Sequence, residues 1–192
     1  ITTGLVGSEM CIRDSHWIYN EFIKTQNLIT KNIEIFRFDE AARYAYQFVW
    51  HSYCDWYLEF LKPIFNSKNK SEIKEAKAFS SFMMANILRI LHPFIPFFTE
   101  NLWSLNAYKK IFNNYLISSN WPDFKINNKF SKNQNNINDL IEIISNIRST
   151  KAELKITPKL YCDIFFDDKS GKLKKLVNRN INLIKQVGRV NN

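Results

Sequence analysis

Apolar residues recur every three or four positions through most of the chain, which is the spacing of amphipathic helices. The runs 17–30 and 38–60 both have this spacing, and Asp39 is the expected N-cap of the second. The second helix should end at Lys62-Pro63, because proline disfavours helical geometry in the residue before it. Its expected buried face consists of Phe38, Ala42, Ala45, Val49, Tyr53, Trp56 and Phe60.

A third helix is predicted after the polar connector 66–70, with Ser71 as its cap. Its apolar stripe consists of Ala76, Phe79, Met83, Ile87 and Ile90. The run 92–96, His-Pro-Phe-Ile-Pro, must interrupt this helix because each proline lacks an N–H donor. We expect His92 to fix the kink by donating to a carbonyl that the prolines leave free. Helix should resume over 99–105.

The last third of the sequence combines one long helical pattern with a shorter mixed one. Residues 118–136 form a linker anchored by Trp121-Pro122, and a helix is predicted over 137–155. Its inward positions are Ile137, Leu140, Ile141, Ile144, Ile147 and Leu154. A strand over 160–166, a turn over 167–171 and a helix over 172–187 follow. The strand has no identifiable partner, so the fold class is mainly α: a helical domain, 16–156, followed by an incomplete α/β domain, 157–192.

The first fifteen residues do not share the periodicity of the rest. Residues 7–15, GSEMCIRDS, resemble a translated sequencing adapter, and they join abruptly to the patterned run at His16. We therefore expect 1–15 to be non-native and leave them out of the fold prediction.

Composition narrows the possible chemistry. The 192 residues contain four glycines, none between Ser8 and Ser170, which argues against a glycine-rich phosphate loop. Three widely spaced cysteines indicate reduced thiols rather than a disulfide frame or a zinc site. Residues 1–124 contain 13 Lys/Arg and 12 Asp/Glu, whereas residues 125–192 contain 14 and 6. A basic C-terminal third favours a polyanionic partner, although an AT-rich genome would also enrich lysine.

Two groups of side chains are candidates for function. His51, Cys54 and Asp55 share one helix, but no oxyanion hole or third metal ligand accompanies them, so no catalytic or metal residue is predicted. Arg148, Lys151 and Lys155 form a basic edge at helical spacing, which suits phosphate contacts, although the spacing alone favours a plain solvated face.

Several segments resemble the valyl-tRNA synthetase family of class I aminoacyl-tRNA synthetases. Residues 37–42 (RFDEAA), 48–50 (FVW) and 54–59 (CDWYLE) are similar to its anticodon-binding domain, and 92–103 (HPFIPFFTENLW) to a signature shared with the isoleucine and leucine enzymes. Residues 147–153 (IRSTKAE) match a further family segment, and Trp121-Pro122 lies at the expected distance. CDWYLE is the segment that favours the valine enzyme.

The resemblance implies a helical anticodon-binding bundle that contacts tRNA(Val), in a cytoplasmic and monomeric protein without membrane or DNA contacts. Residues expected to contact RNA are Arg37, Arg43, Arg148, Lys151 and Lys155. The intact enzyme would use ATP with magnesium, whereas this chain lacks the HIGH-type and KMSKS-type signatures and is expected to be a non-catalytic fragment without a cofactor. Alternatives are a stand-alone helical interaction or RNA-binding module, the same domain of an isoleucine or leucine enzyme, and a small Cys–His hydrolase using Cys54.

Overall fold

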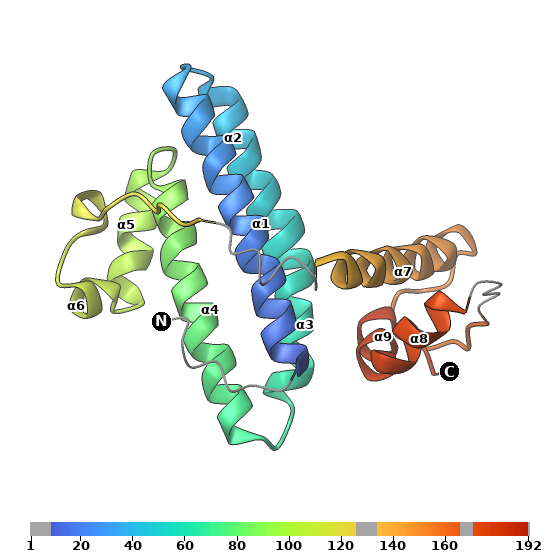
Figure 1. The fold of residues 1–192 in the computed structure, drawn as a ribbon. Coiled ribbons are helices and arrows are strands. Elements are labelled where there is room, and N and C mark those ends of the chain that lie inside the picture. The colour runs from blue at the N-terminus through green and yellow to red at the C-terminus, as the bar shows by residue number, and fades with distance from the viewer. Residues whose placement is uncertain (1–8, 126–133, 166–170, 192) are drawn as a thin grey trace.

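Three long helical rods lie side by side in the centre of the molecule (Figure 1). The computed structural model describes residues 9–125, 134–165 and 171–191. The first rod is α1 (Glu9–Glu34); the second is the continuous run α2 (Phe38–Gln47), η1 (Phe48–Tyr57) and α3 (Leu58–Phe65); the third is α4 (Lys70–Leu91). The predicted mainly α fold class is confirmed. The first helix, α1, begins at Glu9 rather than at the predicted residue 17.

Shorter helices flank the three rods on two sides (Figure 1). On one side, α5 (Pro96–Leu105), α6 (Tyr108–Phe112) and the short η2 (Leu116–Ser118) pack near α4. On the other side are α7 (Gln134–Glu153), α8 (Lys172–Arg179) and α9 (Ile181–Gly188). None of the helices in the described ranges has the length and apolar content needed to span a bilayer.

One continuous apolar core joins the three rods to α7 and α9. Aromatic rings connect the rods: the ring centroids of Phe22 and Phe48 are 5.6 Å apart, and those of Trp17 and Phe60 are 6.1 Å apart. Each such fully buried side chain stabilises the fold by roughly 1.5–3 kcal/mol. A smaller second cluster under α5 and α6 contains Ala85, Leu88, Trp103, Tyr108 and Leu116.

The second rod is not a uniform α-helix, because η1 is a ten-residue π-helix. The N–H of Leu58 bonds to the carbonyl of Tyr53, five residues back rather than four. The buried positions Ala45, Phe48 and Tyr53 are therefore separated by three and then five residues. The predicted stripe is therefore wrong in part: Val49 and Trp56, within η1, are only half-buried. Phe38 is also exposed, at the first position of α2 and before the π-helix. Pi-helical segments are rare and occur frequently at functional sites.

Two predicted helix boundaries are wrong. Pro63 lies inside α3, which continues to Phe65, so the helix does not end at Lys62-Pro63. The N-cap of α4 is Asn69 rather than Ser71: its Oδ1 accepts hydrogen bonds from the backbone N–H of Ser71 at 3.1 Å and of Glu72 at 3.4 Å. The asparagine side chain satisfies two N–H groups that have no partner within the helix.

The kink between α4 and α5 is fixed by His92 through a hydroxyl. His92 Nδ1 lies 2.8 Å from Thr99 Oγ1, and that hydroxyl is 3.0 Å from the carbonyl oxygens of both Ile95 and Pro96. Since the hydroxyl donates its single proton to a carbonyl, His92 donates to the hydroxyl. The predicted direct bond from His92 to a carbonyl is therefore wrong, and α5 resumes at Pro96, because proline is tolerated at the first helical position.

The linker after η2 is anchored as predicted. Trp121 Nε1 donates to Thr30 Oγ1 at 2.9 Å, and the N–H of Phe124 donates to Gln26 Oε1 at 3.3 Å. The predicted helix then follows as α7, with the inward positions Ile137, Leu140, Ile144 and Ile147 buried. Leu154 is 66% exposed, contrary to the prediction, because α7 ends at Glu153.

The predicted strand over 160–166 does not form in the described part of that range. Cys162 makes one isolated parallel bridge with Val190, and the N–H of Asn191 donates to the carbonyl of Cys162 at 3.0 Å. The predicted turn at 167–171 lies, apart from Gly171, outside the described residues. The predicted helix 172–187 is divided at Asn180 into α8 and α9.

Candidate nucleic-acid interface

The first pair of predicted RNA contacts lies at the end of the bundle where α2 begins. Arg37 precedes α2 and binds Asp39 with two hydrogen bonds of 3.2 Å. Arg43, six residues later, pairs with Glu40 and donates to Gln47 Oε1 at 3.3 Å. Both arginines are exposed, and both reach Glu40. A phosphate could bind here only in competition with these carboxylates.

The observed start of α2 overturns the prediction that Asp39 is an N-cap. Arg37 occupies the N-cap position of α2, and Asp39 lies in the first turn. The hydrogen bond from Arg37 lowers the pKa of Asp39, so the carboxylate stays charged next to the positive end of the helix dipole. Asp39 therefore stabilises the start of α2 electrostatically while holding Arg37.

The second group of predicted contacts lies on α7, away from the start of α2 (Figure 1). Arg148 is exposed, yet its guanidinium carbon lies 5.1 Å from the centre of the Trp56 ring. Its Nη2 donates to the carbonyl of Val187 at 3.3 Å. Arg148 thus connects α7 to both η1 and α9, and part of its hydrogen-bonding capacity remains directed to solvent.

Lys151 has a different environment from the other two members of the basic edge. Its side chain is buried, at 6% exposure, and its Nζ donates to the carbonyls of Leu160 at 2.6 Å and Arg189 at 3.0 Å. These bonds hold the segment after α7 and the end of α9 together. Lys155, by contrast, is exposed just beyond α7, where it adopts a left-handed φ of 55°.

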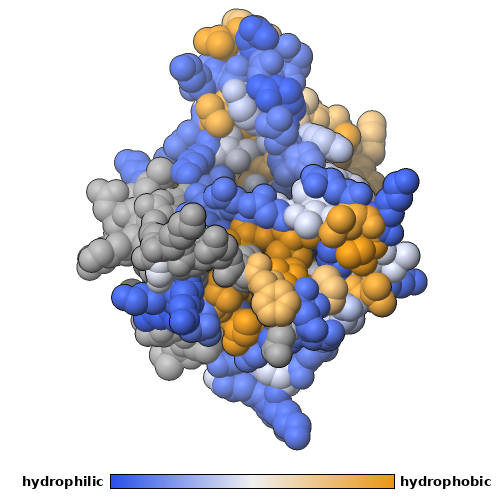
Figure 2. All heavy atoms as spheres, turned by 90° about the vertical axis from the view of Figure 1, so that its right-hand side faces the viewer, coloured by the Kyte–Doolittle hydropathy of each residue, from blue (hydrophilic) through white to orange (hydrophobic). Residues whose placement is uncertain are grey.

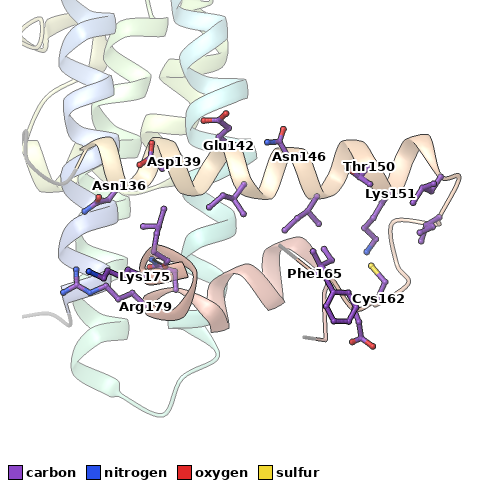
Figure 3. A pocket seen from close by; sticks show the side chains of 18 of the residues that line it. Asn136, Asp139, Glu142, Asn146, Thr150, Lys151, Cys162, Phe165, Lys175 and Arg179 are labelled. Atoms are coloured by element: carbon purple, nitrogen blue, oxygen red, sulfur yellow. Dashed lines mark hydrogen bonds between the residues drawn. The ribbon is translucent and has the colours of Figure 1, made fainter. Parts of the chain in front are cut away.

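Two exposed cations that the sequence analysis did not single out lie on α8. Lys175 and Arg179 line one end of a cleft of about 1100 Å³ between α7 and α8, and Cys162 and Phe165 line the other (Figure 3). The run KLKKLVNR could have identified these two cations from the sequence, because it places Lys175 and Arg179 one helical turn apart.

This side of the molecule is not uniformly basic. Figure 2 shows a hydrophobic area in its centre with hydrophilic residues around it. Exposed apolar side chains of the C-terminal part include Leu154, Leu160 and Phe165. The surface therefore offers apolar contact area bordered by hydrophilic residues of both charges rather than a continuous basic stripe.

The candidate nucleophile Cys54 lacks the environment that activates a thiol. Burial, and then the charge of Asp55, raise the pKa of Cys54, whereas a nucleophilic cysteine needs a lowered pKa. His51 Nδ1 lies 3.3 Å from Asp55 Oδ2, so the described partner of His51 is the Asp55 carboxylate and not the Cys54 thiol. Within the described residues, no group of three or more His, Cys, Asp or Glu side chains is placed to hold a metal ion.

Comparison with known proteins connects this arrangement to a family. A family model described as the anticodon-binding domain of tRNA ligase matches residues 15–166, which include most of α1 and all of the helices from α2 to α7. The chain belongs to this family. The match extends through the three rods, the two arginines near the start of α2 and the basic edge of α7.

Individual relatives of this anticodon-binding domain are named valine–tRNA ligases. The protein from Pelagibacter ubique is 40% identical over 95% of this chain, and that from Rhizobium meliloti is 32% identical over 98%. The Brucella suis protein is 38% identical over 74% of the chain. The aligned regions make up 21%, 20% and 16% of these relatives, so the chain spans about a fifth of their length.

Proposed function

We propose that this chain binds the anticodon region of tRNA(Val) as part of a valine–tRNA ligase. The observation that carries the proposal is the match of residues 15–166 to the anticodon-binding domain of tRNA ligases. The relatives reported above are named valine–tRNA ligases, which favours the valine enzyme over its isoleucine and leucine counterparts. ATP with magnesium belongs to the proposal only for the complete ligase, in which this chain supplies RNA binding without chemistry.

The exposed cations give this proposal a physical basis. Arg148, Lys155, Lys175 and Arg179 are exposed, and all lie in the C-terminal third with its excess of positive charge. Contacts from such side chains to phosphates position an RNA, whereas bases are distinguished by other contacts. Lys151 is not included among the proposed contacts, because its ammonium is already bound to two carbonyls.

A binding titration tests the proposal. The 192-residue chain is titrated into a labelled anticodon stem-loop of tRNA(Val) between 50 and 300 mM salt, with fluorescence anisotropy as the readout. The logarithm of the association constant should fall against the logarithm of salt by about 0.7 for each single-strand phosphate contacted. Matched controls are the same stem-loop with an altered anticodon and a DNA duplex of equal length. Salt-independent binding, or equal affinity for all three ligands, would contradict the proposal.

The complete proposal describes a monomer in the cytoplasm that contacts neither membrane nor DNA. Gel filtration of the chain at several concentrations checks the oligomeric state. The competing hydrolase hypothesis predicts rapid alkylation of Cys54 at neutral pH. Because burial raises the pKa of this thiol, we expect slow alkylation that accelerates only at alkaline pH.

A further inference from the structure

Two aromatic side chains on the second rod have their rings turned toward solvent. Tyr46, in the last turn of α2, is 58% exposed, and Trp50, in η1, is 53% exposed. Their ring planes differ by only 4°, with the ring centroids 6.3 Å apart. We call this pair the Tyr46–Trp50 platform. His51 meets the Tyr46 ring edge-on, at 6.3 Å and 87°.

The platform does not contribute to the core. The buried positions in this part of the rod are Ala45, Phe48 and Tyr53, and the five-residue step of the π-helix lies between the last two. Tyr46 and Trp50 lie off this stripe, one turn apart on the outer side of the rod. Two large rings thus remain half in water, so packing within the described fold does not account for them.

Polar groups border the platform on the preceding turn. Arg43 lies three residues before Tyr46 and is exposed, with Glu40 and Gln47 as polar partners. Its guanidinium carbon lies 4.5 Å from the centre of the neighbouring Tyr44 ring. Parallel rings with a guanidinium nearby are the combination on which proteins stack unpaired bases while contacting the adjoining phosphate. An incoming phosphate would share the Arg43 donors with Glu40.

A second exposed apolar patch shows what distinguishes the platform. At the start of α5, Ile95, Phe97 and Phe98 are 42%, 91% and 60% exposed, and the sequence has no lysine or arginine between Arg89 and Lys109. Aromatic anchors of protein interfaces fill pockets on a partner. The platform instead presents two flat, parallel rings beside a cation, which match the face of a nucleobase.

We propose that Tyr46 and Trp50 stack on an unpaired base of the anticodon loop, with Arg43 contacting the neighbouring phosphate. This inference rests on the proposed RNA-binding function and assigns the base-stacking role to particular residues. It also explains why the outer side of this rod keeps two aromatic rings in solvent. The base that stacks is single-stranded, because a paired base has both faces covered by its neighbours.

The test compares variants of the 192-residue chain in the anisotropy titration described above. Trp50→Ala and Tyr46→Ala should each weaken binding of the stem-loop by about 5- to 150-fold, the range for loss of one base–aromatic stack. Trp50→Phe should keep most of the affinity because phenylalanine retains a ring. Phe97→Ala, at the most exposed ring of the α5 patch, is the matched control and should change affinity less than twofold. Circular dichroism verifies that each variant keeps its helices.

An abasic series identifies the stacked nucleotide. Loop nucleotides are replaced one at a time by abasic sites; at the stacked position, the loss should be smaller in Trp50→Ala than in the unmodified protein, because the stack is already absent. If the unmodified chain binds the stem-loop and Trp50→Ala binds equally well, the platform proposal is overturned and the proposed function stands. If the unmodified chain does not bind, both fail. Loss of self-association with unchanged RNA affinity would assign the platform to a protein contact and also overturn it.

Discussion

Replacing Lys151 with methionine should loosen the C-terminal segment without affecting RNA contacts. The buried ammonium donates to the carbonyls of Leu160 and Arg189, and methionine fills similar space without a donor. A hydrogen bond to a charged group contributes about 1.5–3 kcal/mol, and the ammonium loses hydration on burial. Because Leu160 and Arg189 are themselves exposed, water can reach their carbonyls after the substitution. The net loss should therefore be about 2 kcal/mol, at the lower end of the range for a buried network.

Amide hydrogen exchange measured by NMR reports this loss at named positions. The N–H groups of Val190 and Asn191 are bonded to the carbonyls of Lys185 and Cys162, and they lie next to the carbonyl that Lys151 holds. A loss of about 2 kcal/mol accelerates their exchange by about 30-fold if exchange occurs by opening of this segment. Amides in the middle of α4, outside the segment, should exchange at unchanged rates.

Lys155→Met is the matched control, because it removes an identical charge from an exposed position just beyond α7. It should change stability by no more than about 0.5 kcal/mol. In RNA binding the order of the two variants is reversed. Lys155→Met should reduce the salt slope by about 0.7, whereas Lys151→Met should leave it unchanged. The reasoning is refuted if Lys151→Met leaves exchange at Asn191 within twofold of the unmodified chain, or reduces the salt slope as Lys155→Met does.

Three further substitutions test the fold. Asn69→Ala should cost about 1 kcal/mol in urea unfolding because α4 loses its cap, whereas Ser71→Ala should be nearly neutral; equal costs would contradict the capping assignment. Thr99→Val should cost about 1–3 kcal/mol by leaving His92 without its hydroxyl acceptor, and an unchanged melting temperature would argue against this. Burial lowers the pKa of His16 below its ordinary 6.5, so the unfolded chain binds more protons and stability falls as pH drops below about 6.5. In His16→Gln, the free energy of unfolding should depend less on pH in this range. Identical pH profiles for the variant and the unmodified chain would contradict the role given to His16.

The long helices were predictable because their apolar spacing continues for many turns. The stripes of α4 and α7 contain Met83, Ile87, Ile144 and Ile147 at the expected steps, and these residues are buried as predicted. The π-helical register was not predictable from the same rule, since the spacing rule assumes 3.6 residues per turn throughout. One five-residue step within η1 places Tyr53 and Tyr57 on the buried stripe and leaves Trp56 half-buried at its edge.

The position of Lys151 was available in the sequence but was interpreted as part of a basic edge. Ile137, Leu140, Ile144 and Ile147 step by three and four residues, and Lys151 is the next position of that stripe. A lysine on a buried stripe must find acceptors, and the carbonyls of Leu160, in the segment after α7, and of Arg189, at the end of α9, supply them. What the sequence could not show was which carbonyls, because Arg189 lies 38 residues away and approaches only through the packing of α9 on α7.

The charge of the molecule also has to be divided between cations that already have partners and cations that are exposed. A net charge of +9 overstates the cations available to a polyanion, because Arg37 and Arg43 are paired with carboxylates and Lys151 is bound to carbonyls. Electrostatic attraction to RNA then depends on the exposed cations of α7 and α8, while the rod that carries the Tyr46–Trp50 platform is close to neutral near its start. Affinity at the platform should therefore depend mainly on stacking and fall with salt only through the single Arg43–phosphate contact, whereas affinity at α7 and α8 should fall more steeply with salt. Removing Trp50 should leave the salt slope of RNA binding unchanged while lowering affinity at every salt concentration, because stacking releases no counterions.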